Sequence, residues 1–475
     1  MKNKKYIYSK ITWLLSLVLI IILSCERPIS DDVEFATFPA TAEIFIDGPV
    51  GLGTDFYFPF LGSKPTAWSV DDDESYLGSS SMRFDVPNAN DPEGNFAGAI
   101  FRIDGEGSGR DLSGFDALTF WAKATQAVTI GEVGFGTDFG ENKFQTVTSI
   151  DITTNWIKYT IPIPDASKLI RERGMLWYAA GGVGNAGSEV GYTFWFDEVK
   201  FEKLGTIGQP QPAILNGVDV AEGAFKGTTI DLADLGLTQT FNLASGQNKT
   251  VNAAPSYFTF TSTDIEVARV NELGLVSIVG DGTATITATM GGVRASGSLT
   301  IETLGQFNFA PTPTLDPSRV ISIFSDVYTN VNVDFFNGFW QPFQTTLSAD
   351  FVLNGDNILS YTNFNFVGNQ FSDPTIDATD KSTLHLNMFI PGDIPSNLDF
   401  LISVVDFGAD AAEGGGDDTR QQIFFNGADF VVNEWSTLEA NITLPNRNNI
   451  GLIIYENING SSLESFYLDN IYFHN

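Results

Sequence analysis

Apolar and polar residues alternate in short runs along most of the chain, and no stretch sustains apolar positions at helical spacing. A period of two predicts strands that bury one face and expose the other. Segments rich in glycine and proline separate these runs, as turns between strands require. With 46 glycines and 40 phenylalanines, the composition also suits a fold with many strands and turns. We therefore predict an all-β protein.

Two seams rich in proline and glycine, at residues 205–212 and 305–317, divide the chain. They leave one module at 41–204, a smaller one at 212–303 and a third at 315–475. Three domains also suit a chain of 475 residues, since one domain is expected for about every 150 residues.

The first and third modules follow one plan. Each contains an early alternating strand, a later strand led by tryptophan, and a final strand with an aspartate at its centre. These segments are 118–123 and 384–389, then 156–163 and 435–442, and finally 194–201 and 466–473. The match indicates an internal repeat. We expect Trp156 and Trp435 to close a sandwich edge, and Trp195 to lie in the core because it shares parity with Val199 and Phe201.

The two outer modules also resemble known carbohydrate-binding families. In the first, Arg110–Trp121 and Phe196–Val199 resemble jelly-roll carbohydrate-binding modules with a galactose-binding-domain-like fold. In the third, Val320–Tyr328 and Leu468–Ile471 resemble a C-terminal domain of secreted glycan-degrading proteins from marine Bacteroidota.

The middle module resembles a group 2 bacterial Ig-like domain through Phe260–Val276 and Gly280–Ala288. Such domains usually act as spacers, so we expect no active site in this module. Together, the resemblances imply an all-β fold of two jelly-roll (galactose-binding-domain-like) β-sandwiches separated by an Ig-like β-sandwich.

The N-terminus has the pattern of a signal peptide. Residues 1–24 begin with lysines and continue into an apolar run, which is shorter than the roughly 20 residues of a membrane span. The end of the run, Ile22–Cys25, resembles a bacterial lipobox, which implies that Cys25 carries a lipid. Residues 25–40 would then form a tether. The alternative is a short anchor with an unrelated cysteine.

The acidic residues that soon follow Cys25 resemble the surface-export signal of Bacteroidota lipoproteins. This resemblance implies a protein that is lipid-anchored in the outer membrane and exposed at the cell surface. Its contact with the membrane would be only through the lipid anchor.

The charge balance excludes several partners. The chain has 58 acidic and 25 basic residues, for a formal charge of −33. A nucleic-acid partner requires a basic surface, so none is expected. Polyanionic polysaccharides and anionic lipid headgroups would be repelled as well.

Catalytic signals are also missing from the sequence. The two histidines, His385 and His474, lie too far apart to form a motif, and no serine-nucleophile, zinc-protease or nucleotide-binding motif is present. The acidic runs at 71–74 and 417–418 lie in turn-like contexts, which favour solvated loops over a carboxylate pair for glycoside hydrolysis. We therefore predict a protein that is not an enzyme.

Glycan binding requires solvent-facing aromatic rings that stack on sugars, with polar groups to bond the sugar edges. Strand parity places Trp121 opposite Leu118 and Phe120, and hence outside. Two of the candidates, Arg83 and Arg102, could instead pair with nearby acids. The candidate glycan-binding residues are Trp68, Arg83, Arg102, Trp121, Trp177, Trp340, Tyr361, Asn363, Asn365 and His385.

No cofactor is required, but the jelly-roll resemblance implies a possible structural Ca²⁺ at a sandwich edge. Asp47 with Asp197, and Asp326 with Asp469, occupy comparable positions in the outer modules and offer the hard oxygen ligands that Ca²⁺ prefers. The alternative is that these aspartates cap turns.

These observations predict a non-catalytic surface lipoprotein that captures a neutral polysaccharide for an outer-membrane glycan importer. The resemblance of the third module to domains that accompany marine β-glucanases implies a β-1,3-glucan such as laminarin. Two alternatives stay open: a lipid-anchored glycoside hydrolase or lyase with accessory modules, and an adhesin or structural lipoprotein.

Overall fold

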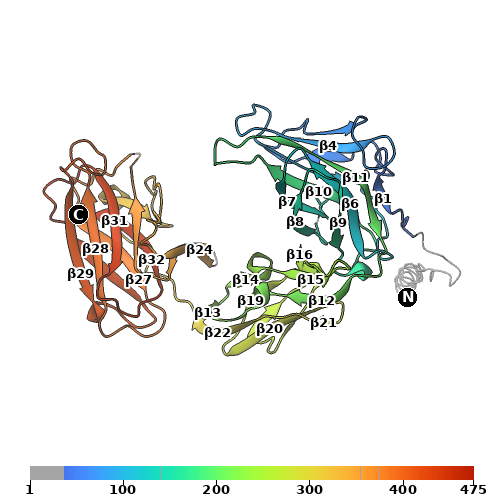
Figure 1. Cartoon of the computed structure of the whole chain (residues 1–475). Helices are drawn as coiled ribbons and strands as arrows, with labels where there is room; N and C mark the ends of the chain where they lie inside the picture. Colours follow the sequence, from blue (N-terminus) through green and yellow to red (C-terminus); the bar gives the residue numbers. More distant parts are fainter. Residues whose placement is uncertain (1–36, 141, 354, 373) are drawn as a thin grey trace, which may run out of the picture. The chain divides into compact units, whose positions relative to one another are not determined.

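The computed structural model describes residues 37–475, except 141, 354 and 373. The expected signal peptide, Cys25 and most of the tether lie outside the described residues. The described residues divide into two compact units, one up to residue 207 and the other from 208 to 475 (Figure 1). The described residues form strands joined by loops and short 3₁₀ helices, which confirms the all-β prediction. No helix among them is long and apolar enough to cross a membrane.

The first unit holds a sandwich of two sheets, called here the N-terminal sandwich. Its first sheet has the order β3-β4-β11-β6-β9, with β1 also paired to β11. The strands of this sheet are β1 (Glu43–Phe45), β3 (Trp68–Asp71), β4 (Ser81–Val86), β6 (Ala117–Ala124), β9 (Ile157–Pro162) and β11 (Tyr192–Glu202). Its second sheet has the order β2-β5-β10-β7-β8. Those strands are β2 (Tyr57–Pro59), β5 (Phe96–Arg102), β7 (Val128–Phe135), β8 (Thr146–Ile152) and β10 (Gly174–Gly181), and the 3₁₀ helix η1 spans Ala166–Lys168.

Alternation builds the core of this sandwich, as the sequence predicts. Phe120 of β6 is fully buried, whereas its neighbour Trp121 is only partly buried on the outer face. Phe84 of β4 stacks on Phe194 of β11, with ring centroids 4.6 Å apart, and Tyr178 of β10 closes the cluster from the other sheet. The core therefore lies between the two sheets, and the side chains at alternate positions lie on their outer faces.

The second unit begins with the Ig-like module. One sheet has the order β13-β22-β20-β17, with β21 paired to β20, and another has the order β14-β19-β18, while β12, β15 and β16 pair in sequence. The strands are β12 (Gly208–Ala213), β13 (Asp219–Lys226), β14 (Thr229–Asp231), β15 (Thr238–Asn242), β16 (Asn248–Ala253), β17 (Thr259–Ser262), β18 (Ala268–Val270), β19 (Leu275–Ile278), β20 (Thr283–Met290), β21 (Val293–Arg294) and β22 (Ser298–Gln306). The 3₁₀ helices are η2 (Leu215–Gly217), η3 (Leu232–Leu235) and η4 (Pro255–Tyr257).

The C-terminal sandwich completes the second unit. Its first sheet has the order β24-β25-β32-β27-β30, with β23 paired to β32, and its second sheet has the order β26-β31-β28-β29. The strands are β23 (Val320–Phe324), β24 (Leu347–Leu353), β25 (Asp356–Thr362), β26 (Phe366–Gln370), β27 (Thr383–Phe389), β28 (Asp399–Asp406), β29 (Thr419–Asn426), β30 (Trp435–Asn441), β31 (Ile450–Asn457) and β32 (Phe466–His474), with 3₁₀ helices η5 (Pro317–Arg319) and η6 (Gly427–Asp429). Strand for strand, the first sheet repeats the order of its N-terminal counterpart, which confirms the internal repeat.

The two sandwiches also share a bulge in the final strand. In β11, Glu198 adopts a φ of 52° and its N–H donates to the carboxylate of Asp197 at 2.7 Å. In β32, Asn470 adopts a φ of 51° and donates to Asp469 at 2.6 Å. Trp195 is buried, as expected, with 7% of its surface exposed. The bulge shifts side-chain parity, however, so its indole lies on the face opposite Val199 and Phe201, where it donates to Asp71 at 2.9 Å.

The C-terminal sandwich packs directly on the Ig-like module. Phe225 of the Ig-like module and Phe307 of the second seam are buried in one apolar cluster with Leu353, Ile358 and Phe389 of the sandwich. The indole of Trp435, expected at a sandwich edge, packs against this cluster and donates to the carbonyl of Asn308 at 2.5 Å. The start of the second seam, at Phe307 and Asn308, is therefore packed against the C-terminal sandwich.

Candidate functional site

Aromatic residues collect on the outer face of the second sheet of the N-terminal sandwich. Phe58 of β2 lies opposite Ile100 of β5, and Ile100 lies opposite Trp177 of β10. Tyr178 points into the core, so its neighbour Trp177 points to the outer side of the sheet, where the surrounding side chains leave it only 6% exposed. One row across three strands therefore carries two aromatic rings on the same face.

Further rings and one cation extend this row into a surface, which we call the aromatic face: Phe58, Phe60, Arg102, Phe139 and Trp177. Phe60 meets Trp177 and Phe139 edge to face, at centroid distances of 6.2 and 6.4 Å. The Arg102 guanidinium lies 4.1 Å from the centre of the Phe58 ring. Phe139 is 52% exposed, so the surface presents a ring to solvent.

A glycine lets the rings approach the sheet. A Cβ added at Gly98 would lie 2.9 Å from the Phe96 ring and 3.0 Å from the Phe60 ring. Real side chains do not approach so closely without displacing a neighbour. The absence of a side chain on β5 therefore allows Phe60 to lie close against the strand.

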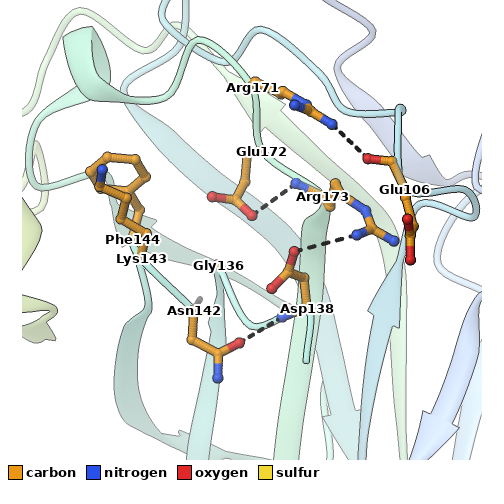
Figure 2. Close-up of a pocket in the computed structure, with 9 residues that line it drawn as sticks. All are labelled: Glu106, Gly136, Asp138, Asn142, Lys143, Phe144, Arg171, Glu172 and Arg173. Carbon is orange, nitrogen blue, oxygen red and sulfur yellow. Dashed lines mark hydrogen bonds and ion pairs between the residues drawn. The ribbon is translucent and has the colours of Figure 1, made fainter. Parts of the chain in front are cut away.

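A pocket of about 380 Å³ adjoins the aromatic face where the β7–β8 loop meets the start of β10 (Figure 2). Arg102 connects the two, because its Nη1 donates to the carbonyl of Asp138 at 2.8 Å, and Asp138 lines the pocket. The lining residues are Glu106, Gly136, Asp138, Asn142, Lys143, Phe144, Arg171, Glu172 and Arg173.

The pocket holds an acid that is protonated more readily than usual. Glu172 is buried, and its Oε1 accepts hydrogen bonds from the backbone of Arg173 and Gly174, both at 2.8 Å. Burial raises the pKa of Glu172 to about 7, and Asp138 adds to the increase. Arg173 lies 3.8 Å from Asp138, and Figure 2 shows both beside Glu172. The pocket thus holds the contact between Arg173 and Asp138 beside a carboxyl whose pKa is about 7.

Three of the buried polar atoms that lack a hydrogen-bond partner among the described residues lie at this surface. The Nε atoms of Arg102 and Arg173 and the indole nitrogen of Trp177 are buried, and none makes a hydrogen bond within the described part of the chain. Buried donors are normally satisfied, and exceptions often accompany functional sites. Their position supports the aromatic face and its pocket as the site.

The structure brings together two of the five glycan-binding candidates of the first module, Arg102 and Trp177. Trp68 packs at the sandwich edge against Tyr57, at 5.2 Å between ring centroids. Trp121 lies on the outer face of the other sheet, where Tyr76 stacks on it at 3.7 Å and covers one side of its ring. Arg83, on the same sheet as Trp121, pairs with Asp71 and Asp85, as the alternative for this residue anticipated.

In the C-terminal sandwich, Trp340 lies on the outer face of the second sheet. A Cβ added at Gly368 of β26 would come within 2.1 Å of the Trp340 ring, so the indole rests directly on the strand. It packs beside Val405, Phe407 and Leu452. This surface occupies the position in the repeat that the aromatic face occupies in the N-terminal sandwich.

The other candidates of the third module lie elsewhere. Tyr361 is fully buried and donates to the carbonyl of Phe336 at 2.8 Å, so its assignment to a solvent-facing glycan site is wrong. Asn365 accepts from the backbone N–H of Thr345 at 2.9 Å and so holds a loop. Asn363 is exposed in a turn with a φ of 52°. His385 lies on the first sheet, where it contacts Glu439.

The sequence-based candidates do not include Phe58, Phe60, Phe139 or Glu172, because most of the aromatic residues among them are tryptophans. A signal was present for three of these four residues. Phe58 and Phe60 alternate within 56–60, and Phe139 lies in a loop between Gly136 and Gly140 that a strand-ending turn would expose. Nothing local marks Glu172, whose burial follows from the packing of distant loops.

The expected calcium ligands of both sandwiches accept hydrogen bonds from backbone amides, including those of Asn357 to Asp326 and of Asn470 to Asp469. Backbone amides of residues 76–80 donate to Asp47 at 2.5 and 3.0 Å and to Asp197 at 2.7 and 3.0 Å. These donors occupy oxygens that a cation would need, which favours the turn-capping alternative. Burial raises the pKa of Asp469 to about 7, with contributions from Asp356 and Asp326. Calcium at Asp326 and Asp469 stays a prediction.

Two family models match the chain. Residues 56–203 match carbohydrate binding domain 30, and residues 235–301 match the bacterial Ig-like domain (group 2). The first match includes every residue of the aromatic face. Both agree with the module types that the sequence predicts, and they support glycan binding by a multimodular carbohydrate-binding protein.

The individual proteins that resemble this chain share little sequence identity with it. An α-L-arabinofuranosidase of Bifidobacterium longum subsp. longum is 24% identical over 250 residues, which cover 49% of this chain and 23% of the relative. A solved family 30 carbohydrate-binding module is 17% identical over 34% of this chain and 86% of its own, with a TM-score of 0.24. A family 11 module of Clostridium thermocellum, solved with a β-1,3-1,4-mixed-linked tetrasaccharide, is 16% identical over 33% of this chain and 95% of its own, with a TM-score of 0.23.

Proposed function

We propose that this protein captures a neutral polysaccharide on the aromatic face and catalyses no reaction on it. The observation that carries the proposal is the cluster of Phe60, Phe139 and Trp177 on an outer sheet face, with Arg102 over the rings of Phe58 and Phe139. Sugar rings stack on aromatic planes, and a few central aromatics supply most of the binding energy at such surfaces. Arg102 and the polar pocket would bond the sugar edges.

Charge supports a neutral ligand. The chain carries a formal charge of −33, and the pocket beside the aromatic face adds no net positive charge, because its three acids are matched by the three basic residues Lys143, Arg171 and Arg173. A sulfated or uronic-acid polymer would therefore be repelled. We propose a β-1,3-glucan such as laminarin, on the resemblance of the third module to domains that accompany marine β-glucanases.

The setting of this activity is also part of the proposal. With a lipid on Cys25, the protein would be held at the surface of the outer membrane of a Bacteroidota cell and would pass its glycan to an importer. The Trp340 surface of the C-terminal sandwich supports a second binding site, which would increase avidity if one polymer reaches both.

Calorimetric titration of the full chain with laminarin and with alginate tests the ligand class. We expect laminarin to bind more tightly, because stacking needs no opposite charge. Tighter binding of alginate than of laminarin would contradict the proposal of a neutral ligand. If neither polymer bound, the proposal that laminarin is the ligand would be wrong.

One observation favours glycoside hydrolysis as a second candidate. Glu172 has the raised pKa that a general acid needs, and Asp138 lines the same pocket. Release of reducing ends from a glycan, abolished by Glu172→Gln, would establish an enzyme. We expect the wild-type protein to release no more reducing ends than the Glu172→Gln variant does.

A further inference from the structure

Both histidines of the chain lie against one carboxylate on the outer face of the first sheet of the C-terminal sandwich. His385 of β27 is the direct cross-strand partner of Glu439 of β30. On the other side of β27, Thr383 pairs with His474 of β32, which places His474 diagonally next to His385. The chain has two histidines in 475 residues, so their meeting at one glutamate is a specific feature of this sheet.

The three side chains have the geometry of a metal-binding group. Nδ1 of His385 lies 2.7 Å from Oε1 of Glu439, and Nε2 of His474 lies 3.0 Å from Oε2 of the same residue. All three potential ligand atoms lie within 4.8 Å of one another. In tetrahedral zinc sites with bonds of 2.0–2.1 Å, ligand atoms are about 3.3 Å apart, so small side-chain shifts would admit an ion.

The surroundings hold these groups in place. Tyr472 stacks on the imidazole of His385 with a centroid distance of 4.3 Å. The side chains of His385 and His474 are only 11% and 18% exposed, whereas that of Glu439 is 49% exposed. A half-exposed carboxylate therefore faces two nearly buried imidazoles, with solvent access on one side.

We propose that His385, Glu439 and His474 bind one divalent transition-metal ion of the zinc type, which clips together three neighbouring strands. Two imidazoles and a carboxylate suit zinc, and water would complete the coordination from the exposed side. The site lies on the sheet opposite the Trp340 surface and is independent of the proposed glycan binding.

The presence of only two histidines makes the test direct. The untagged full chain is labelled with ¹⁵N at histidine and titrated with zinc chloride at pH 7.5, and the imidazole signals are followed by NMR. We expect both imidazoles to shift together and to saturate at one equivalent, and the melting temperature to increase. An absence of shifts in both at ten equivalents would overturn the proposal and leave a hydrogen-bonded triad without an ion.

Variants supply the second measurement. We expect His385→Gln and His474→Gln each to weaken zinc binding at least tenfold in calorimetry, and the exposed Glu434→Gln to leave it unchanged. Full zinc affinity in the variant that lacks both histidines would overturn the proposal by placing the ion elsewhere. Because the NMR titration uses the unaltered chain, a variant that fails to fold does not affect it.

Discussion

Trp177 lies directly across the sheet from Gly134, where an added Cβ would come within 3.0 Å of the Trp177 indole nitrogen and 1.8 Å of the Thr146 carbonyl oxygen. The aromatic face thus depends on a missing side chain on β7. We expect Gly134→Ala to destabilise the protein by about 1–3 kcal/mol, as overpacking does, and to weaken glucan binding. Gly131→Ala, on the same strand with its nearest neighbour 3.9 Å away, is the matched control for calorimetric melting and titration.

The two outer faces of the N-terminal sandwich should differ in function. Trp177→Ala is expected to weaken laminarin binding about 30-fold, which corresponds to the roughly 2 kcal/mol of a central aromatic. Trp121→Ala, on the opposite sheet and covered by Tyr76, should change it less than twofold. Isothermal titration of both variants measures the two affinities, and a larger loss of laminarin affinity in Trp121→Ala would place the binding site on the other sheet.

The exposed Phe139→Ala should weaken laminarin binding with little change in melting temperature, which separates an effect on binding from an effect on folding.

Glu172 should make stability depend on pH. Because its pKa is raised from 4.5 to about 7 in the folded state, the folded protein holds a proton that the unfolded chain has released. Stability should therefore decrease as the pH rises from about 4.5 to about 7. Glu172→Gln keeps an acceptor for the amides of Arg173 and Gly174 and should flatten this part of the curve. Urea denaturation at pH 5 and pH 8 measures the effect, and parallel curves for the variant and the wild type would contradict it.

Phe307 should couple the Ig-like module to the C-terminal sandwich. It is buried against Phe225 and Phe389, so Phe307→Ala leaves a cavity between them and is expected to cost about 3–5 kcal/mol. A fragment of residues 305–475 should likewise melt at a higher temperature than one of residues 315–475. Phe309→Ala, at an exposed position two residues further, is the control. Equal melting temperatures for the two fragments would show that the contact contributes little.

Tyr361 should matter for folding and not for glycan binding. Its hydroxyl donates to Phe336 and accepts from Asn369, and Tyr455 donates to the same Asn369. Tyr361→Phe removes one partner from this buried network and is expected to cost about 1–3 kcal/mol. Laminarin titration of the folded variant should match the wild type. A specific loss of binding would return Tyr361 to the candidate site.

The repeat, the strands and the outward direction of Trp121 could be predicted because period-two alternation is local to each strand. Parity fails where the backbone departs from a regular strand. The turn at Asn363 interrupts the alternation that would place Tyr361 outside, and the bulge after Asp197 puts the buried Trp195 on the face opposite Val199 and Phe201. The meeting of His385 with His474 depends on the pairing of strands distant in sequence, which no local pattern encodes.

The matching bulges also bear on the history of the chain. Two sandwiches can reach the same strand order independently, because few orders are favourable. A left-handed residue directly after an aspartate in the final strand, at 198 and again at 470, is not required by that order. Gene duplication is the simplest explanation: one ancestral module gave rise to both sandwiches, which now differ in that only the C-terminal one holds the pair of histidines.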